Sequence, residues 1–270
     1  MAGKFQKVTC QGRTGYAVAD FPRDALIRLV ECPELPLRSG PAETIKAGNS
    51  ALVVRAMLPM HGVMTPVAYK RVRRKTLLKQ VTQAVSGNRT LRTFLAGHRF
   101  LDRGVATARP LAVIVPSRFD FAAPTWIASE WIDGENLASL AIRTERRPMT
   151  NAAAIAVGKL LGRMHAAGIS HRDLKSQNVM VRRTAEGGYV ASVIDLDGVT
   201  FLSSITAARR WKDLARLAAD AATWAGLSRS TRLRFLIAYA YAAGLPKCHK
   251  AAWRQVSAKV LARLDRRHVA

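Results

Sequence analysis

The most informative stretch of the chain is His171-Arg172-Asp173-Leu174-Lys175-Ser176-Gln177-Asn178. It follows a predicted helix and places a carboxylate, Asp173, five residues before an amide, Asn178. Phosphoryl transfer needs both groups close together, because a carboxylate orients the attacking hydroxyl while an amide oxygen holds a magnesium ion that bridges the phosphates of ATP. We therefore predict that Asp173 is a catalytic base and Asn178 a metal ligand. Lys175 is predicted to place a positive charge on the transferring phosphoryl group.

A second carboxylate lies downstream, in Val193-Ile194-Asp195-Leu196-Asp197-Gly198. Two β-type runs precede it, at 179–181 and 189–191, and Gly187-Gly188 separates them, which predicts a hairpin. The hairpin would return Asp195 to Asn178, and we predict Asp195 as the principal magnesium ligand. The alternative is an accidental His-Arg-Asp tripeptide followed by an aspartate that caps a strand. The ordered combination of loop, hairpin and carboxylate argues against it.

Residues that could bind ATP occur upstream. Val67-Ala68-Tyr69-Lys70 ends a predicted strand and matches the V-A-I-K pattern, whose lysine contacts the α- and β-phosphates. A charge that protects a strand edge is the alternative reading of Lys70. One hairpin earlier, Gly48, Asn49 and Ser50 would allow a tight turn with backbone donors for phosphate, although an ordinary hairpin turn would look the same.

The secondary-structure pattern changes near residue 130. Before it, strands are predicted at 51–57 and 65–72, with a turn at Met60-His61-Gly62. After it, helical periodicity predicts helices at 151–166, 207–225, 229–243 and 251–264. Glu130-Trp131-Ile132-Asp133-Gly134 would connect the two parts, and because clefts at such junctions hold ligands, we predict ATP contacts at Glu130 and Ile132.

This pattern predicts an α+β, bilobal fold with a small β-rich lobe and a larger helical lobe. The expected division is an N-terminal extension at 1–41, the β-rich lobe at 42–129 and the helical lobe at 130–270.

The charge of the chain points to an anionic partner. It has 43 Lys and Arg against 18 Asp and Glu, a formal net charge of +25. A nucleic acid, an anionic membrane face or a phosphorylated substrate would each be attracted, while a merely solvated basic surface would give the same count. Three widely spaced cysteines and no secretory signal favour a cytosolic location, with peripheral binding to the inner membrane face as an option. The longest apolar run, 235–245, is too short to span a bilayer.

Two further side chains near the loop carry open interpretations. His165 precedes the loop by six residues, but no third ligand has suitable spacing, so we expect a partly buried histidine at a helix end rather than a metal ligand. Asp213, in Trp211-Lys212-Asp213-Leu214, either hydrogen-bonds the loop backbone from a following helix or is a charge at that helix's N-terminus.

These motifs resemble the protein-kinase-like superfamily over roughly residues 42–220. More narrowly, they are similar to the bacterial lipopolysaccharide kinase family of the Kdo/WaaP type, which phosphorylates Kdo or heptose. The narrower resemblance rests on the stretch from Gly97 to Ala112 and on Ile194-Asp195-Leu196-Asp197, which lacks the Phe-Gly of protein kinases. No Ala-Pro-Glu segment follows.

The resemblance implies the same roles for Asp173, Asn178, Asp195 and Lys70. It also implies ATP and Mg²⁺ as cofactors, and an anionic glycolipid or lipopolysaccharide precursor as the acceptor, with an anionic membrane surface as a possible partner. Nucleic acid is the less favoured partner. The alternatives are a RIO-like protein serine kinase, a small-molecule phosphotransferase, or a pseudokinase that binds RNA or membrane through its basic surface.

One departure from the kinase pattern concerns Lys70. Kinases pair this lysine with a helix glutamate, but no Asp or Glu occurs between Glu43 and Asp102. Asp102 or Asp195 would then replace the glutamate, or ATP itself would order the lysine, or the enzyme would be slow or inactive.

Overall fold

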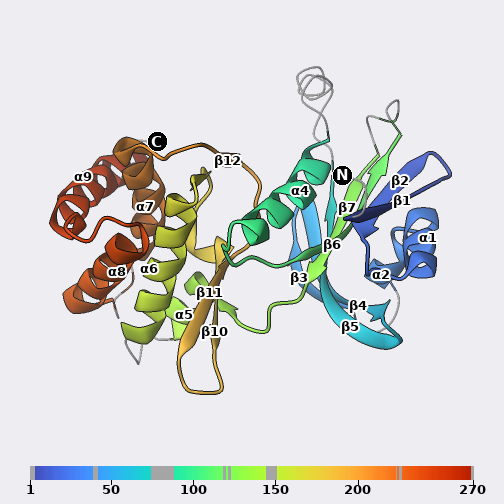
Figure 1. The fold of residues 1–270 in the computed structure, drawn as a ribbon, viewed down its shortest axis with the longest axis horizontal. Helices are drawn as coiled ribbons and strands as arrows, with labels where there is room; N and C mark the ends of the chain where they lie inside the picture. Colours follow the sequence, from blue (N-terminus) through green and yellow to red (C-terminus); the bar gives the residue numbers. More distant parts are fainter. Residues whose placement is uncertain are drawn as a thin grey trace. The chain divides into compact units, whose positions relative to one another are not determined.

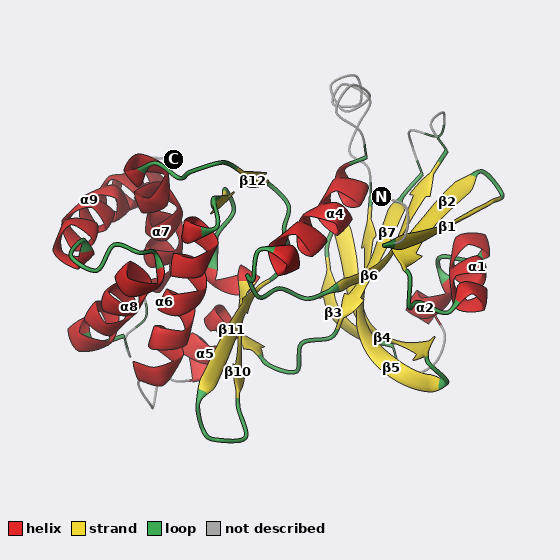
Figure 2. Ribbon diagram, viewed as in Figure 1, coloured by secondary structure: helices red, strands yellow, loops and turns green. Residues whose placement is uncertain are grey.

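A computed structural model describes residues 4–38, 42–73, 88–117, 120, 123–143, 151–222, 224 and 227–268. The chain forms two compact units, the first made of Met1–Arg99 and Ala108–Trp131, the second of Phe100–Thr107 and Ile132–Ala270. The first is rich in strands and the second in helices, as Figure 2 shows, which confirms the predicted α+β class.

The strands of the first unit form one seven-stranded antiparallel sheet in the order β1-β2-β6-β7-β5-β4-β3 (Figure 1). At the β4–β5 hairpin, His61 and Gly62 have φ of 49° and 79°, so the predicted turn is present and needs its glycine. The strands are β1 (Phe5–Cys10), β2 (Arg13–Val18), β3 (Glu43–Ala47), β4 (Ala51–Met60), β5 (Val63–Val72), β6 (Pro110–Pro116) and β7 (Thr125–Glu130).

The structure changes the expected role of the N-terminal residues. Instead of an extension at 1–41, the described residues here supply β1 and β2 to the sheet, followed by helices α1 (Arg23–Glu31) and α2 (Leu35–Arg38). Helix α1 is held because Leu26, Leu29 and Val30 are buried in the core. The division at residues 41 and 42 therefore does not separate two structural units.

Each face of the sheet has its own apolar core. One contains α1 and the β-strand residues Val67, Tyr69 and Trp126. The other packs Phe94 of helix α4 (Arg89–Asp102) against strand residues that include Ile127. Lys70 on β5 pairs directly with Ile127 on β7, and directly paired residues point to the same face, so Lys70 lies on the α4 face.

The second unit combines helices with two small sheets (Figure 1). Helix α6 has the predicted bounds, and the later helices differ from prediction by a few residues at their ends, as does the hairpin β10–β11. The helices are α5 (Leu137–Arg143), α6 (Asn151–Ala166), α7 (Ala207–Ala221), α8 (Arg229–Ala242) and α9 (His249–His268). The strands are β8 (Glu135–Asn136), β9 (Ile169–His171), β10 (Val179–Arg183), β11 (Tyr189–Val193) and β12 (Val199–Phe201).

Helices α6 and α8 are in very close contact through two glycines of α6. A Cβ atom on Gly158 would lie 2.4 Å from the carbonyl oxygen of Phe235, and one on Gly162 would lie 2.5 Å from that of Tyr239. No side chain fits at either position without moving α8, so the two glycines set the distance between the helices. This packing supports α6, which leads directly into β9 and the loop that carries Asp173.

Candidate active site

The predicted catalytic residues lie on a short loop between two strands of the second unit. Strand β9 ends at His171, the chain turns through Asp173 and Lys175, and a single 3₁₀ turn, Ser176–Asn178, leads into β10. The Nζ of Lys175 lies 2.8 Å from Oδ1 of Asp173 and 3.0 Å from Oδ2. Both side chains are about half exposed, so the carboxylate of Asp173 can be approached by a hydroxyl group from solvent.

Asn178 is held in a defined orientation. Its Nδ2 donates a hydrogen bond to the main-chain oxygen of Asp173 at 2.8 Å. Because the nitrogen end of the amide faces the loop, its oxygen end points to the other side, as a metal ligand requires. This hydrogen bond fixes the candidate metal ligand, Asn178, relative to the backbone of the candidate base, Asp173.

The hairpin brings Asp195 back to this loop. Val179 and Val193 are register partners, and the main-chain N–H of Ile194 donates to the carbonyl oxygen of Asn178 at 2.9 Å. Asp195 follows directly and has φ of 56°, in the left-handed region that few residues other than glycine adopt. Aspartate tolerates this conformation better than most residues, and such backbone is concentrated at functional sites. The predicted return of Asp195 to Asn178 is confirmed.

These groups suit a magnesium ion. Mg²⁺ prefers hard oxygen ligands and is bound in kinases by one or two protein groups together with waters and substrate phosphates. The amide oxygen of Asn178 and the carboxylate of exposed Asp195 are oxygen donors of this kind. The donor chemistry therefore fits the ion, with the remaining positions left to water and ATP.

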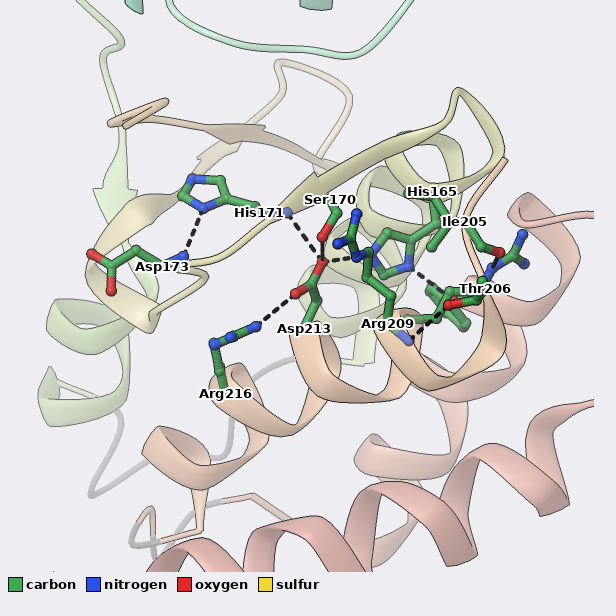
Figure 3. Close-up of polar contacts among 11 residues, drawn as sticks. His165, Ser170, His171, Asp173, Ile205, Thr206, Arg209, Asp213 and Arg216 are labelled. Atoms are coloured by element: carbon green, nitrogen blue, oxygen red, sulfur yellow. Dashed lines mark hydrogen bonds and ion pairs between the residues drawn. The ribbon is translucent and has the colours of Figure 1, made fainter. Parts of the chain in front are cut away.

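Helix α7 anchors the loop from below through Asp213, as Figure 3 shows. The buried carboxylate accepts hydrogen bonds from Ser170 Oγ at 2.6 Å and from the main-chain N–H of His171 at 3.0 Å. Arg216 Nη1 lies 2.7 Å from its other oxygen. Of the two interpretations of Asp213, the structure confirms the hydrogen bond to the loop backbone.

The position of Asp213 follows from local sequence and packing. Thr206 caps α7, since its Oγ1 accepts from the main-chain N–H of Arg209. His165 is fully buried beside Asp213, with Nε2 3.5 Å from Oδ2 and Nδ1 2.9 Å from the hydroxyl of Tyr239. His165 thus lies at the end of α6, as predicted, but it is fully rather than partly buried, because it packs beside Asp213 and Tyr239.

The ionisation of Asp213 and His171 is controlled by their surroundings. Burial alone would raise the pKa of Asp213, but contacts with His165, Ser170 and the main chain of His171 outweigh it and hold the pKa below its usual range. Burial lowers the pKa of His171, although the nearby carboxylates of Asp195, Asp213 and Asp173 act in the opposite direction. A neutral His171 can accept the hydrogen bond that Asp173 N–H donates to its Nδ1 at 3.2 Å.

A second anchor, Asp220, was not anticipated from the sequence. Its Oδ2 accepts from the main-chain N–H of Ser176 at 3.1 Å and from Ser176 Oγ at 3.2 Å. Asp220 lies seven residues after Asp213, two helical turns along the same side of α7. That spacing was the available signal, but it identifies Ser176 as the partner only once α7 is placed beneath the loop.

Comparison with known proteins identifies the family. A family model described as "Lipopolysaccharide kinase (Kdo/WaaP) family" matches residues 55–239, more than half of the chain, and this range includes the whole loop and both anchors. The chain belongs to the lipopolysaccharide kinase family. Members of the family are ATP-dependent phosphotransferases that phosphorylate a sugar hydroxyl of lipopolysaccharide, and this protein is one of them.

The fold of this lipopolysaccharide kinase is shared with a solved structure described as "WaaP in complex with acyl carrier protein". The TM-score is 0.55 at 21% identity, and the match covers 82% of this chain and 88% of that chain. No curated protein sequence matches the chain.

The remaining predicted residues of the kinase lie elsewhere. The structure brings Asp173, Lys175, Asn178 and Asp195 together in the second unit, whereas Lys70 belongs to the first. Gly48, Asn49 and Ser50 form the exposed turn between β3 and β4, as predicted. Glu130 ends β7, where its N–H donates to the oxygen of Arg109 at 2.9 Å, and Ile132 begins the second unit. The ATP contacts of these first-unit and connector residues stay predictions.

Proposed function

We propose that Asp173 is the catalytic base of this lipopolysaccharide kinase and that Asn178 and Asp195 hold the Mg²⁺ that accompanies ATP. When bound, the ion would neutralise charge on the phosphates. Asp173 orients the attacking sugar hydroxyl and accepts its proton, while Lys175 places its ammonium beside the transferring phosphoryl group. Lys70, the turn at 48–50, Glu130 and Ile132 contribute the ATP contacts.

The observation that carries this proposal is the double use of Asn178. The side-chain Nδ2 of Asn178 donates a hydrogen bond to the main-chain oxygen of Asp173. The main-chain oxygen of Asn178 accepts a hydrogen bond from the N–H of Ile194, which precedes Asp195. Base and candidate ligands are therefore connected by two hydrogen bonds within one unit. The ion pair between Lys175 and Asp173 adds a cation that can transfer its contact from the carboxylate to an incoming phosphate.

We further propose that the acceptor is an anionic glycolipid presented at the inner face of the cytoplasmic membrane. The net charge of +25 supports this proposal, because anionic lipids and phosphorylated sugars attract such a protein. Among the described residues, no helix has both the length and the apolar character needed to cross a bilayer. Contact with a membrane through a helix of this part would then be peripheral.

The metal assignment is tested by following the transfer of radiolabelled γ-phosphate from ATP to a lipopolysaccharide-type glycolipid extract. Wild-type protein should label the lipid fraction with Mg²⁺, lose this activity in excess chelator and regain it when Mg²⁺ is restored. Asp195→Asn should lower the activity by at least about a hundredfold and raise the Mg²⁺ concentration needed for half-maximal rate. Asp197→Asn, two residues away, is the matched control. Equal loss in both variants, or activity in chelator, would contradict the assignment.

A further inference from the structure

Helix α8 carries a row of exposed apolar side chains. Leu233, Ile237 and Tyr241 have exposed fractions of 43%, 36% and 70%, and they are spaced four residues apart. Residues at this spacing lie above one another on a single side of a helix. Leu245, 37% exposed, follows just beyond the end of the helix.

This row is separate from the face that α8 contributes to the protein core. Leu236, Tyr239 and Ala240 are buried, and the backbone of α8 packs directly onto Gly158 and Gly162 of α6. A surface helix needs only one apolar face to hold it in place. A second, solvent-facing apolar row indicates an interaction surface.

The segment of sequence that carries the row has charges of one sign. No Asp or Glu occurs between Asp220 and Asp265, a segment that contains α8 and most of α9. Arg229 and Arg234 are exposed on α8, and exposed basic residues continue along the next segment and α9 as Lys247, Lys250, Arg254 and Lys259. Exposed apolar side chains on a helix whose own charged residues are all arginines suit the headgroup region of an anionic bilayer, where apolar burial and attraction to lipid phosphate act together.

We propose that this outer face of α8, defined by Leu233, Arg234, Ile237 and Tyr241, binds an anionic phospholipid surface. The three apolar side chains enter the boundary between headgroups and acyl chains, and Arg234 contacts lipid phosphate. The proposal rests on the proposed function in one respect, because a lipid-anchored acceptor would lie in the same membrane surface that α8 binds.

Charge complementarity selects the membrane over other occupants. A second copy of the chain would bring together two helices whose charged residues are all arginines, and like charges across an interface oppose association. A nucleic acid would use the arginines but leave the apolar row in water, since its affinity comes from phosphate contacts. An anionic bilayer satisfies both the apolar row and the arginines.

The test is sedimentation of the full-length protein with lipid vesicles. Wild type should bind vesicles that contain phosphatidylglycerol and bind pure phosphatidylcholine vesicles much more weakly. The triple variant Leu233→Ser, Ile237→Ser, Tyr241→Ser should bind the anionic vesicles at least about tenfold more weakly. The matched control is Val63→Ser with Met64→Ser, at positions 65% and 55% exposed in the first unit, which should bind like wild type.

Three results would overturn the proposal. These are undiminished vesicle binding by the α8 variant, equal binding of wild type to both kinds of vesicle, and wild-type self-association in ultracentrifugation that the variant abolishes. A thermal melt confirms that the variant is folded; if it is not, Tyr241→Ser alone is used, with a smaller loss expected.

Two further measurements distinguish failure of the membrane proposal from failure of the catalytic assignment. Asp173→Asn should bind anionic vesicles like wild type while losing phosphate transfer. The α8 variant should phosphorylate a delipidated, water-soluble acceptor at the wild-type rate, and a reduced rate on that acceptor would count against a purely membrane-docking role.

Discussion

At the scale of single residues, the site depends on side chains that each make more than one defined contact. Asn178 binds the backbone of Asp173 and is bonded through its own backbone to Ile194. Lys175 differs, since its ion pair with Asp173 is half exposed and such pairs add roughly 0–1 kcal/mol to stability. Its value to the protein is therefore expected in the chemistry rather than in folding.

Replacing Lys175 tests this distinction. Lys175→Met should lower kcat by about a hundredfold, because one preorganised charge on the transferring group is lost, and should leave the thermal midpoint nearly unchanged. Lys159→Met, an exposed lysine on α6, is the control and should change neither quantity. A large fall in the thermal midpoint with unchanged kcat would reverse the assignment.

His171 gives the stability a defined dependence on pH. Burial holds its pKa below the ordinary 6.5 in the folded protein, so the unfolded chain binds more protons below that pH. The contribution is fully present above pH 6.5 and is lost as the pH falls towards the folded-state pKa. Denaturant unfolding between pH 7.5 and pH 5 should show a fall in the free energy of unfolding that is smaller in His171→Gln. Parallel curves for the two proteins would refute it.

At the scale of elements, α7 acts as the support of the catalytic loop. Asp213 and Asp220 stand two turns apart and hold the loop at His171 and at Ser176. Asp213 is the more deeply buried of the two. Without its carboxylate, the partly buried guanidinium of Arg216 would lose this ion pair.

Removing the Asp213 carboxylate should therefore be costly. Asp213→Ala should lower the free energy of unfolding by about 3–5 kcal/mol, because it leaves Ser170, the His171 N–H and Arg216 without their acceptor. Chemical denaturation measures the loss. Lys212→Ala, at the neighbouring exposed position, should stay within about 0.5 kcal/mol of wild type. A loss below about 1 kcal/mol for Asp213→Ala would show that solvent or other groups replace the carboxylate.

The contact between α6 and α8 is a second element-level test. Alanine is the better helix former by about 1 kcal/mol, but a Cβ at Gly162 meets the Tyr239 carbonyl at 2.5 Å and the Ala242 Cβ at 2.6 Å. The Tyr239 carbonyl is part of the backbone and cannot rotate aside, so the steric clash should outweigh the gain in helix propensity. Gly162→Ala should therefore lower the free energy of unfolding by about 1–2 kcal/mol net. Thermal or denaturant unfolding decides, and a stabilised variant would mean that the helices can separate at little cost.

The elements best predicted from sequence were those with strong local signals. Helix α6 has regular apolar spacing and a glycine stop, and Gly187-Gly188 marks the β10–β11 hairpin. The N-terminal β1, β2 and α1 were not predicted: residues 1–41 were interpreted as an extension, and one of the two sheet partners of β2 is β6, about a hundred residues away, a pairing that local sequence does not reveal. Asp220 was missed for the same reason: its role depends on a tertiary contact with Ser176.

At the scale of the whole molecule, charge and chemistry agree. A chain with +25 net charge carries a loop suited to phosphoryl transfer and belongs to a family of kinases that act on lipopolysaccharide. Basic residues outnumber acidic ones fourteen to three after residue 205, where α7, α8 and α9 lie. A protein of this charge is drawn to anionic glycolipids before any specific contact forms.

The most direct test of the central claim is the transfer of labelled γ-phosphate from ATP to a glycolipid acceptor by wild type and by Asp173→Asn. The variant keeps the size of the side chain but cannot accept a proton. We predict that wild type labels the acceptor and that Asp173→Asn is slower in kcat by at least about a hundredfold, with little change in ATP affinity. Asp173→Asn with wild-type turnover would contradict Asp173 as the base, and with it this account of the site.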